Sequence, residues 1–159
     1  MNIFVCIKQV PATETKIKPS ADGAGIDTAG IKWIMSPYDE FAVEEALRVK
    51  EKNAGSTVTV FTSGPQRVTE VLRTALAMGC DNAVWVDSPE NSDSTMTSKA
   101  LAGAIKKEGA FDLIFTGKQA IDDDCAQVSQ LLATYLEIPY LTVVLNAEYG
   151  TAVTAKRET

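Results

Sequence analysis

Residues 56–79 read STVTVFTSGPQRVTEVLRTALAMG, and this stretch contains the two patterns that decide the fold. Residues 56–62 are mostly β-branched or aromatic, which predicts a buried strand. Residues 66–78 carry apolar side chains at helical spacing and Gly79 follows as a C-terminal cap, so a helix is predicted there. A strand joined to a helix by the short turn at residues 63–65 is the repeating unit of an α/β protein.

The same alternation extends in both directions along the chain. Further strands are predicted at residues 2–7, 82–86 and 111–116, and further helices at residues 37–52, 95–108 and 122–137. Two last strands, at residues 139–146 and 151–156, predict a C-terminal β-hairpin. Alternating strands and helices imply a mostly parallel sheet with helices on both faces. We therefore expect one α/β domain, built as a three-layer sandwich.

A long turn-rich segment, residues 9–32, separates the first strand from the first helix. Within it, Asp22 and Gly23 can turn a small hairpin. The helix that follows has a strong start signal, because Ser36 can cap it and Pro37 suits its first position. Asp39 lies three residues after the cap, so the capping pattern explains this stretch without a ligand.

Composition and charge exclude several classes of protein. The formal net charge is −6, which argues against nonspecific binding to nucleic acid or to anionic membranes. No apolar run approaches the roughly 20 residues of a membrane span, so we expect no membrane insertion. Three widely spaced cysteines indicate reduced thiols, in a bacterial cytoplasm or a matrix-like compartment. The chain has no histidine, so the commonest general base and metal ligand is missing.

The first candidate site is the stretch GKQAIDDD at residues 117–124, between a predicted strand and a predicted helix. Gly117 lets the backbone approach a ligand closely, Lys118 offers a cation and Gln119 an amide. The three aspartates are expected in the first turn of the helix, where one or two acids complement the helix dipole. Three adjacent acids repel one another, so a ligand role and a capping role both stay open. A metal site is disfavoured, because adjacent helical side chains point in different directions.

The turn at residues 63–65, SGP, is the second candidate, because backbone amides at a helix start can receive phosphate. A simple strand-to-helix turn explains it as well, and the chain has neither a GxGxxG nor a GxxxxGK[ST] motif. Cys6 is expected to be a small core residue. Cys125 is expected in the first turn of the last helix, beside acids that oppose a reactive thiolate.

Five stretches together resemble the electron-transfer flavoprotein β-subunit family, which includes the FixA-type proteins. They are IKQVP at residues 7–11, SPYDEFAVEEALR at 36–48, SGP at 63–65, LRTALAMGCD at 72–81 and DLIFTGKQAIDDDCAQ at 112–127. They occur in the family's order and spacing and cover nearly the whole chain.

The resemblance implies an adenine nucleotide α-hydrolase-like (Rossmann-like) α/β fold and an electron carrier subunit without catalytic residues of its own. Such a subunit binds AMP structurally and pairs with an electron-transfer flavoprotein α subunit that holds most of the FAD contacts. The heterodimer takes electrons from acyl-CoA or related dehydrogenases and passes them to a quinone oxidoreductase or another acceptor. Family members are longer than this chain, so the resemblance predicts an N-terminal nucleotide-binding domain without the family's C-terminal arm.

The resemblance also assigns cofactor-binding positions. They are Cys6, Ser36, Pro37, Tyr38, Asp39, Ser63, Gly117, Lys118, Gln119, Ala120, Ile121, Asp122, Asp123, Asp124, Cys125, Ala126, Gln127 and Val128. Backbone groups of residues 117–124 are expected to hold the phosphate and ribose. The family usually has Asn at the position of Ser36, and the shorter hydroxyl keeps the cap but puts a ligand contact in doubt.

Three alternatives stay open at this stage. One family branch binds a second FAD in this pocket and bifurcates electrons, and its last motif carries Gly where this chain has Asp123 and Gly-Pro where it has Ser129 and Gln130. These departures favour AMP, although Val128 matches that branch. The second alternative is a stand-alone, stress-protein-like module that binds ATP or AMP. The third is a nucleotide-hydrolysing or ligating enzyme that relies on the acids of residues 122–124.

Overall fold

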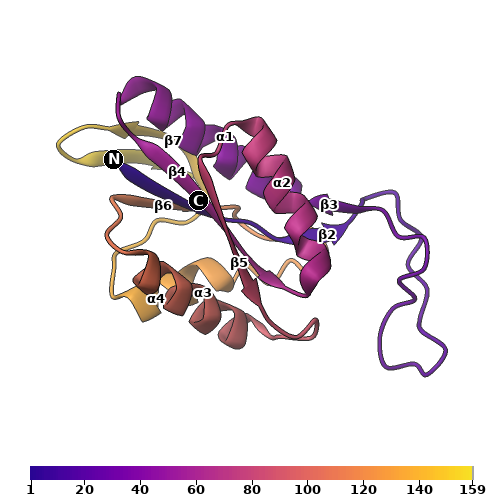
Figure 1. Ribbon diagram of the computed structural model, residues 1–159. Helices are drawn as coiled ribbons and strands as arrows, with labels where there is room; N and C mark the ends of the chain where they lie inside the picture. The colour runs from indigo at the N-terminus through magenta and orange to yellow at the C-terminus, as the bar shows by residue number, and fades with distance from the viewer. Residues whose placement is uncertain (159) are drawn as a thin grey trace.

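The computed structural model describes residues 1–158. Strands and helices alternate along the chain (Figure 1). The elements are β1 (Asn2–Cys6), β2 (Gln9–Pro11), β3 (Trp33–Met35), α1 (Pro37–Lys52), β4 (Thr57–Gly64), η1 (Gln66–Val68), α2 (Thr69–Met78), β5 (Asn82–Asp87), α3 (Ser94–Glu108), β6 (Leu113–Thr116), α4 (Val128–Leu136), β7 (Val144–Tyr149) and β8 (Val153–Arg157).

The central sheet has four parallel strands in the order β5-β4-β1-β6. Strand β1 lies inside the sheet, so Ile3 pairs with Val58 of β4 on one side and with Leu113 of β6 on the other. Figure 1 shows α1 and α2 on one face of this sheet and α3 and α4 on the opposite face. The predicted three-layer α/β sandwich is therefore confirmed.

Each face of the sheet has its own core, because successive residues of a strand point to opposite faces. Ile3 and Val5 of β1 pack in the cluster shared with α1 and α2. Phe4 and Cys6 pack in the cluster shared with α3 and α4. Burial on both faces explains why β1 is almost continuously apolar rather than alternating.

The turn-rich segment before α1 contains more structure than its sequence predicted. Strands β2 and β3 pair antiparallel at its base, where the sequence predicted only loop. Between them the chain forms an arm that extends away from the body (Figure 1), closed by a bridge between Pro19 and Ile26. Gly23 has φ of 69°, which confirms the predicted turn at Asp22 and Gly23.

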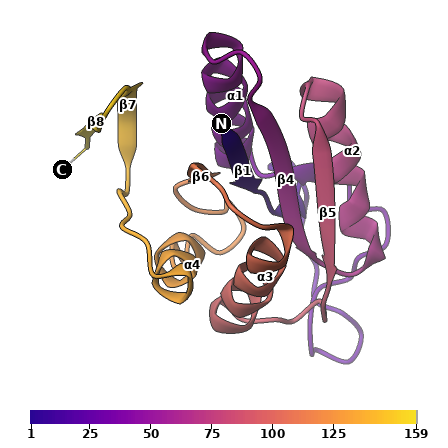
Figure 2. The ribbon, with the colours of Figure 1, turned by 60° about the vertical axis from the view of Figure 1, so that its left-hand side comes forward.

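The C-terminal hairpin is present, formed by the antiparallel strands β7 and β8. Figure 2 shows it apart from the parallel sheet. Its first strand begins at Val144, later than the predicted residue 139, and Tyr149 anchors the hairpin with its ring 5.8 Å from the ring of Phe115.

The last helix departs most from its prediction. Helix α4 begins at Val128, not at residue 122, so neither the three aspartates nor Cys125 lies in its first turn. Asp124 and Ala126 both have φ of 51°, and this left-handed backbone cannot continue an α-helix. Residues 117–127 are instead an irregular loop between β6 and α4.

Candidate functional site

A cleft of about 1030 Å³ opens at the carboxyl ends of the four parallel strands. From β1 the chain passes through α1 to β4 on one side, while β6 lies on the other side of β1. Strand order therefore reverses between β1 and β6. In open α/β sheets this switch point is the usual place for a ligand, because the strand-end loops diverge there.

Asp39 ties the two strands of the switch point together. Its Oδ2 accepts a hydrogen bond from the Lys8 backbone N–H at 2.7 Å, and its Oδ1 accepts one from the Gly117 backbone N–H at 3.0 Å. Burial raises the pKa of Asp39 to about 7; the two N–H donors and the charge of Lys8 oppose this rise, and Asp122 adds to it. Lys8 follows β1 and Gly117 follows β6, so one buried carboxylate fixes both loop origins.

Gly117 is required by this close approach. A Cβ at this position would overlap Oδ1 of Asp39 and would lie 2.9 Å from the backbone carbonyl carbon of Tyr38. The sequence predicted that this glycine lets the backbone approach a ligand, whereas the structure shows it packed against the first turn of α1.

The capping prediction for α1 is only partly correct. Pro37 does occupy the first turn, but Ser36 makes no side-chain cap bond, and its buried Oγ has no partner within residues 1–158. The backbone carbonyl of Ser36 instead accepts from the N–H groups of Asp39 and Glu40. Asp39 does not complete a capping box either, because its carboxylate is held by Lys8 and Gly117.

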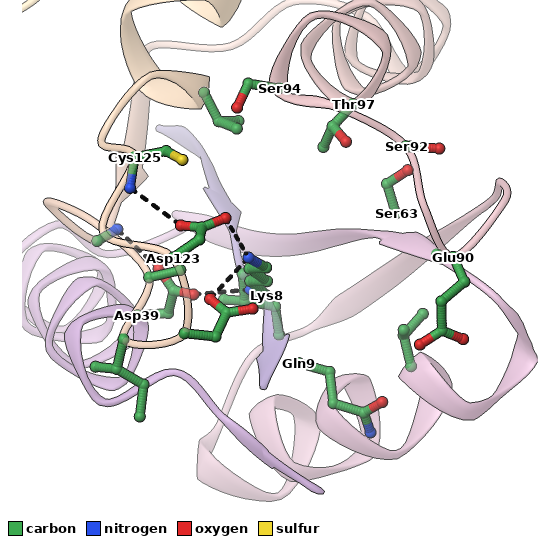
Figure 3. Close-up of a pocket in the computed structure, with 18 of the residues that line it drawn as sticks. Lys8, Gln9, Asp39, Ser63, Glu90, Ser92, Ser94, Thr97, Asp123 and Cys125 are labelled. Atoms are coloured by element: carbon green, nitrogen blue, oxygen red, sulfur yellow. Dashed lines mark hydrogen bonds and ion pairs between the residues drawn. The ribbon is translucent and has the colours of Figure 1, made fainter. Parts of the chain in front are cut away.

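The acidic residues after β6 form a turn that Lys8 holds (Figure 3). Lys8 Nζ lies 2.8 Å from Asp122 Oδ1 and 3.0 Å from Asp123 Oδ2. Burial alone would raise the pKa of Asp123, but the Cys125 N–H and Lys8 together hold this pKa below its usual value. Asp124 points elsewhere and accepts a hydrogen bond from Gln119 at 2.6 Å.

The loop presents backbone donors that no protein group uses. Among residues 1–158, the N–H groups of residues 118–123 donate no hydrogen bond, and those of residues 128–130, in the first turn of α4, donate none either. Gln127 stands at the N-cap of α4 without a side-chain cap. Unpaired amides at a loop and at a helix N-terminus are suited to bind an anion such as phosphate.

The far end of the cleft is held by Arg67, just after β4. Its guanidinium stacks over the ring of Trp33 at 3.7 Å, donates to Gln9 Oε1 at 2.7 Å and pairs with Glu90. Nearby, the hydroxyl oxygens of Ser63 and Ser88 lie 2.8 Å apart. This end therefore offers hydroxyl and aromatic surface rather than free positive charge.

Most of the site residues expected from the sequence line this cleft. Those that line it are Cys6, Asp39, Ser63, Gly117, Lys118, Gln119, Ala120, Ile121, Asp122, Asp123, Cys125, Ala126, Gln127 and Val128. Ser36, Pro37, Tyr38 and Asp124 do not line it.

Sequence reasoning missed five lining residues that make specific contacts. They are Lys8, Gln9, Arg67, Ser88 and Glu90. The signal that could have found most of them was their place just after strands β1 and β5, since carboxyl-end loops gather at one edge of a parallel sheet.

Cys6 lies in the core, as predicted, and burial raises its thiol pKa to about 12. Among the described residues, no cluster of three or more His, Cys, Asp or Glu side chains could hold a metal ion. Within the same part of the chain, no helix has the length and apolar character to cross a membrane.

The fold and the cleft define a Rossmann-like α/β domain with a cleft at its switch point. The family model for the electron transfer flavoprotein domain matches residues 24–159, so the chain belongs to the electron transfer flavoprotein family.

Three relatives illustrate this membership. The chain is 42% identical over 142 residues to electron transfer flavoprotein subunit beta of Dictyostelium discoideum, covering 89% of the chain and 56% of the relative. It is 41% identical over 162 residues to the same subunit of Bacillus subtilis strain 168, covering 99% of the chain and 62% of the relative. It is 44% identical over 147 residues to the caffeyl-CoA reductase-Etf complex subunit CarD of Acetobacterium woodii, covering 91% and 55%. The resemblance to β subunits is thus confirmed, and the chain spans less than two thirds of each of these relatives.

Proposed function

We propose that this chain is the nucleotide-binding part of an electron transfer flavoprotein β subunit and binds AMP in the switch-point cleft. The AMP has a structural role. The chain acts as an electron carrier subunit rather than as an enzyme, and FAD is held mainly by an α subunit. That heterodimer moves electrons from acyl-CoA or related dehydrogenases to a quinone oxidoreductase or another acceptor.

The observation that carries the AMP proposal is the set of unpaired backbone N–H groups at residues 118–123 and at the start of α4. A phosphate placed there gains several N–H donors and the positive end of a helix dipole. Donors of this kind suit a phosphate even in a chain whose net charge is −6, because the backbone supplies them locally.

The remainder of the cleft suits the adenosine half of the ligand. Its far end presents the hydroxyls of Ser63 and Ser88 and the stacked pair of Arg67 and Trp33. Ligand sites commonly combine apolar and aromatic walls with a few polar groups that set orientation. In this proposal the phosphate lies at the loop after β6 and the base lies toward β4 and β5.

A second FAD in the same cleft is the alternative, favoured by the volume of about 1030 Å³, which is at the upper end for small-molecule sites. The relative from Acetobacterium woodii belongs, by its name, to a caffeyl-CoA reductase complex. Asp123 weighs against a second flavin phosphate here, since it adds a carboxylate at the loop where the bifurcating branch has glycine.

The deciding experiment identifies what the protein binds. Small molecules released from purified protein are identified by mass spectrometry, and the emptied protein is titrated with AMP, adenosine and FAD by calorimetry. Co-purified AMP, with AMP bound more tightly than adenosine, supports the proposal. Protein that carries no adenine nucleotide and takes up none contradicts it, and FAD bound in preference to AMP supports the alternative.

A further inference from the structure

Lys8 joins three carboxylates that come from two separate parts of the chain. Its backbone N–H donates to Asp39 at 2.7 Å, and its side-chain Nζ lies within 3.0 Å of Asp122 and Asp123 (Figure 3). Burial lowers the pKa of the Lys8 ammonium, but the bonds to Asp122 and Asp123 outweigh it, so this pKa stays above its usual value. Lys8 is therefore a fixed cation at neutral pH.

These contacts anchor the loop after β6 at its start and at the acidic turn in its middle. Asp39 holds the N–H of Gly117 at the start of the loop, and the Lys8 ammonium holds the acidic turn at Asp122 and Asp123. Between the two anchors lie backbone N–H groups for which residues 1–158 provide no acceptor. The direction of those donors thus depends on an ion pair that links the end of β1 to a turn 114 positions further along the chain.

We propose that Lys8 is a positioning residue, whose ammonium holds the acidic turn so that the loop amides converge on the phosphate of the bound nucleotide. This proposal rests on the proposed function of the cleft. The ammonium acts through the turn rather than on the ligand, because two carboxylates already compensate its single charge. It also offsets the repulsion that Asp122 and Asp123 would exert on each other and on an anionic ligand.

Replacement of Lys8 tests the side chain alone, because any residue other than proline keeps the backbone N–H that donates to Asp39. The test uses two variants: Lys8→Met removes the positive charge, and Lys8→Arg keeps it. The matched control is Lys50→Met. Lys50 also pairs with an aspartate, Asp81 at 2.7 Å, but it does not line the cleft.

Two measurements are made on each variant: calorimetric titration with AMP and with adenosine, and amide hydrogen exchange of the ligand-free loop at residues 117–125. We expect Lys8→Met to weaken AMP binding at least about fivefold and adenosine binding by less than about twofold, and to speed exchange in the loop. Lys8→Arg is expected to stay within about twofold of the wild type in both measurements, and Lys50→Met to change neither.

Each contrary result is informative. If the wild type binds AMP and Lys8→Met keeps the same preference for AMP over adenosine, the role of Lys8 is wrong while the nucleotide site stands. If AMP binding weakens but loop exchange is unchanged, Lys8 touches the ligand directly and the positioning role is overturned. If the wild type binds no AMP at all, the proposed function fails and the role of Lys8 fails with it.

Discussion

The backbone N–H of Gly117 donates to Oδ1 of Asp39 across 3.0 Å, and the bond is buried. It connects the end of β6 to the first turn of α1, 78 positions apart in the chain. A second bond, from the Lys8 N–H, brings the end of β1 to the same carboxylate. The geometry of the cleft floor, formed by Lys8, Asp39 and Gly117, therefore depends on how closely these three segments approach one another.

Gly117→Ala is expected to destabilise the fold by about 1–3 kcal/mol, because the added Cβ must displace Asp39 or the backbone of Tyr38. Urea unfolding followed by circular dichroism measures the effect. Gly103→Ala in α3 is the control; its Cβ meets nothing within 4 Å, so it should stabilise the helix by about 0.5–1 kcal/mol. Equal stabilities for the wild type and Gly117→Ala would show that Asp39 and the backbone of Tyr38 can move aside without loss of stability.

Asp39 gives the protein a distinctive dependence on pH. Its pKa is raised from 3.8 to about 7 in the folded state, so between these two pH values the folded chain holds a proton that the unfolded chain has released. Stability therefore falls as pH rises from about 4 to 7, by up to about 1.4 kcal/mol per pH unit from this group. Asn at position 39 cannot accept from both backbone N–H groups, so Asp39→Asn should be less stable at every pH. It has no carboxyl group to titrate, so the fall in its stability between about pH 4 and 7 should disappear. Unfolding free energies measured from pH 5 to 8 test the prediction, and parallel curves for the two proteins would refute it.

Two helix starts should respond in opposite ways to alanine. The Asp93 side chain caps α3 by accepting from the Met96 N–H at 2.7 Å, so Asp93→Ala should cost about 1 kcal/mol. Ser36 buries a hydroxyl that has no partner in the described part of the chain, so Ser36→Ala should leave the ligand-free protein equally stable or more stable. Thermal unfolding of both variants makes the comparison. A large loss for Ser36→Ala would mean that its hydroxyl has a partner in solution.

The core on the α3 and α4 face depends on Phe61, which is fully buried with its ring 5.0 Å from the ring of Phe4. Phe61→Ala should cost about 3–5 kcal/mol, through lost burial and the cavity that remains. Phe41→Ala is the matched control, because Phe41 is 72% exposed on α1 and its loss should change stability by less than about 0.5 kcal/mol. Urea unfolding measures both, and similar losses would contradict this assignment of the core.

The three thiols should differ in reactivity. Burial raises the pKa of Cys6 to about 12 and that of Cys80 to about 11, whereas Cys125 is exposed in the loop after β6. Since the thiolate is the reactive form, iodoacetamide at pH 8 should label Cys125 at least about tenfold faster than the other two. Peptide mass spectrometry over time measures the rates. A fast-reacting thiol that persists in Cys125→Ser would show that a buried cysteine opens to solvent.

Local patterns were sufficient for most of the secondary structure. The strand at β4, the cap at Gly79 and the start of α1 at Pro37 all lie where short-range spacing and turn chemistry placed them. The predicted start of α4 was wrong. The acidic residues after Gly117 are typical of a helix N-terminus, but the backbone is left-handed at Asp124 and Ala126 and no helix forms there. The contact of the acidic turn with Lys8 is long-range, so no local pattern contains it.

By itself, the sequence determined the family and the succession along the chain of the four parallel strands and the four α-helices, because hydrophobic periodicity and motif spacing are properties of neighbouring residues. It also pointed to the loop after β6 as the place for a ligand. Only the tertiary structure decided that Asp39 joins Lys8 to Gly117, that Ser36 leaves its hydroxyl unpartnered, and that Lys8 holds the acidic turn. These contacts arise because parallel strands bring their carboxyl ends to one edge of the sheet, where residues distant in the chain become neighbours.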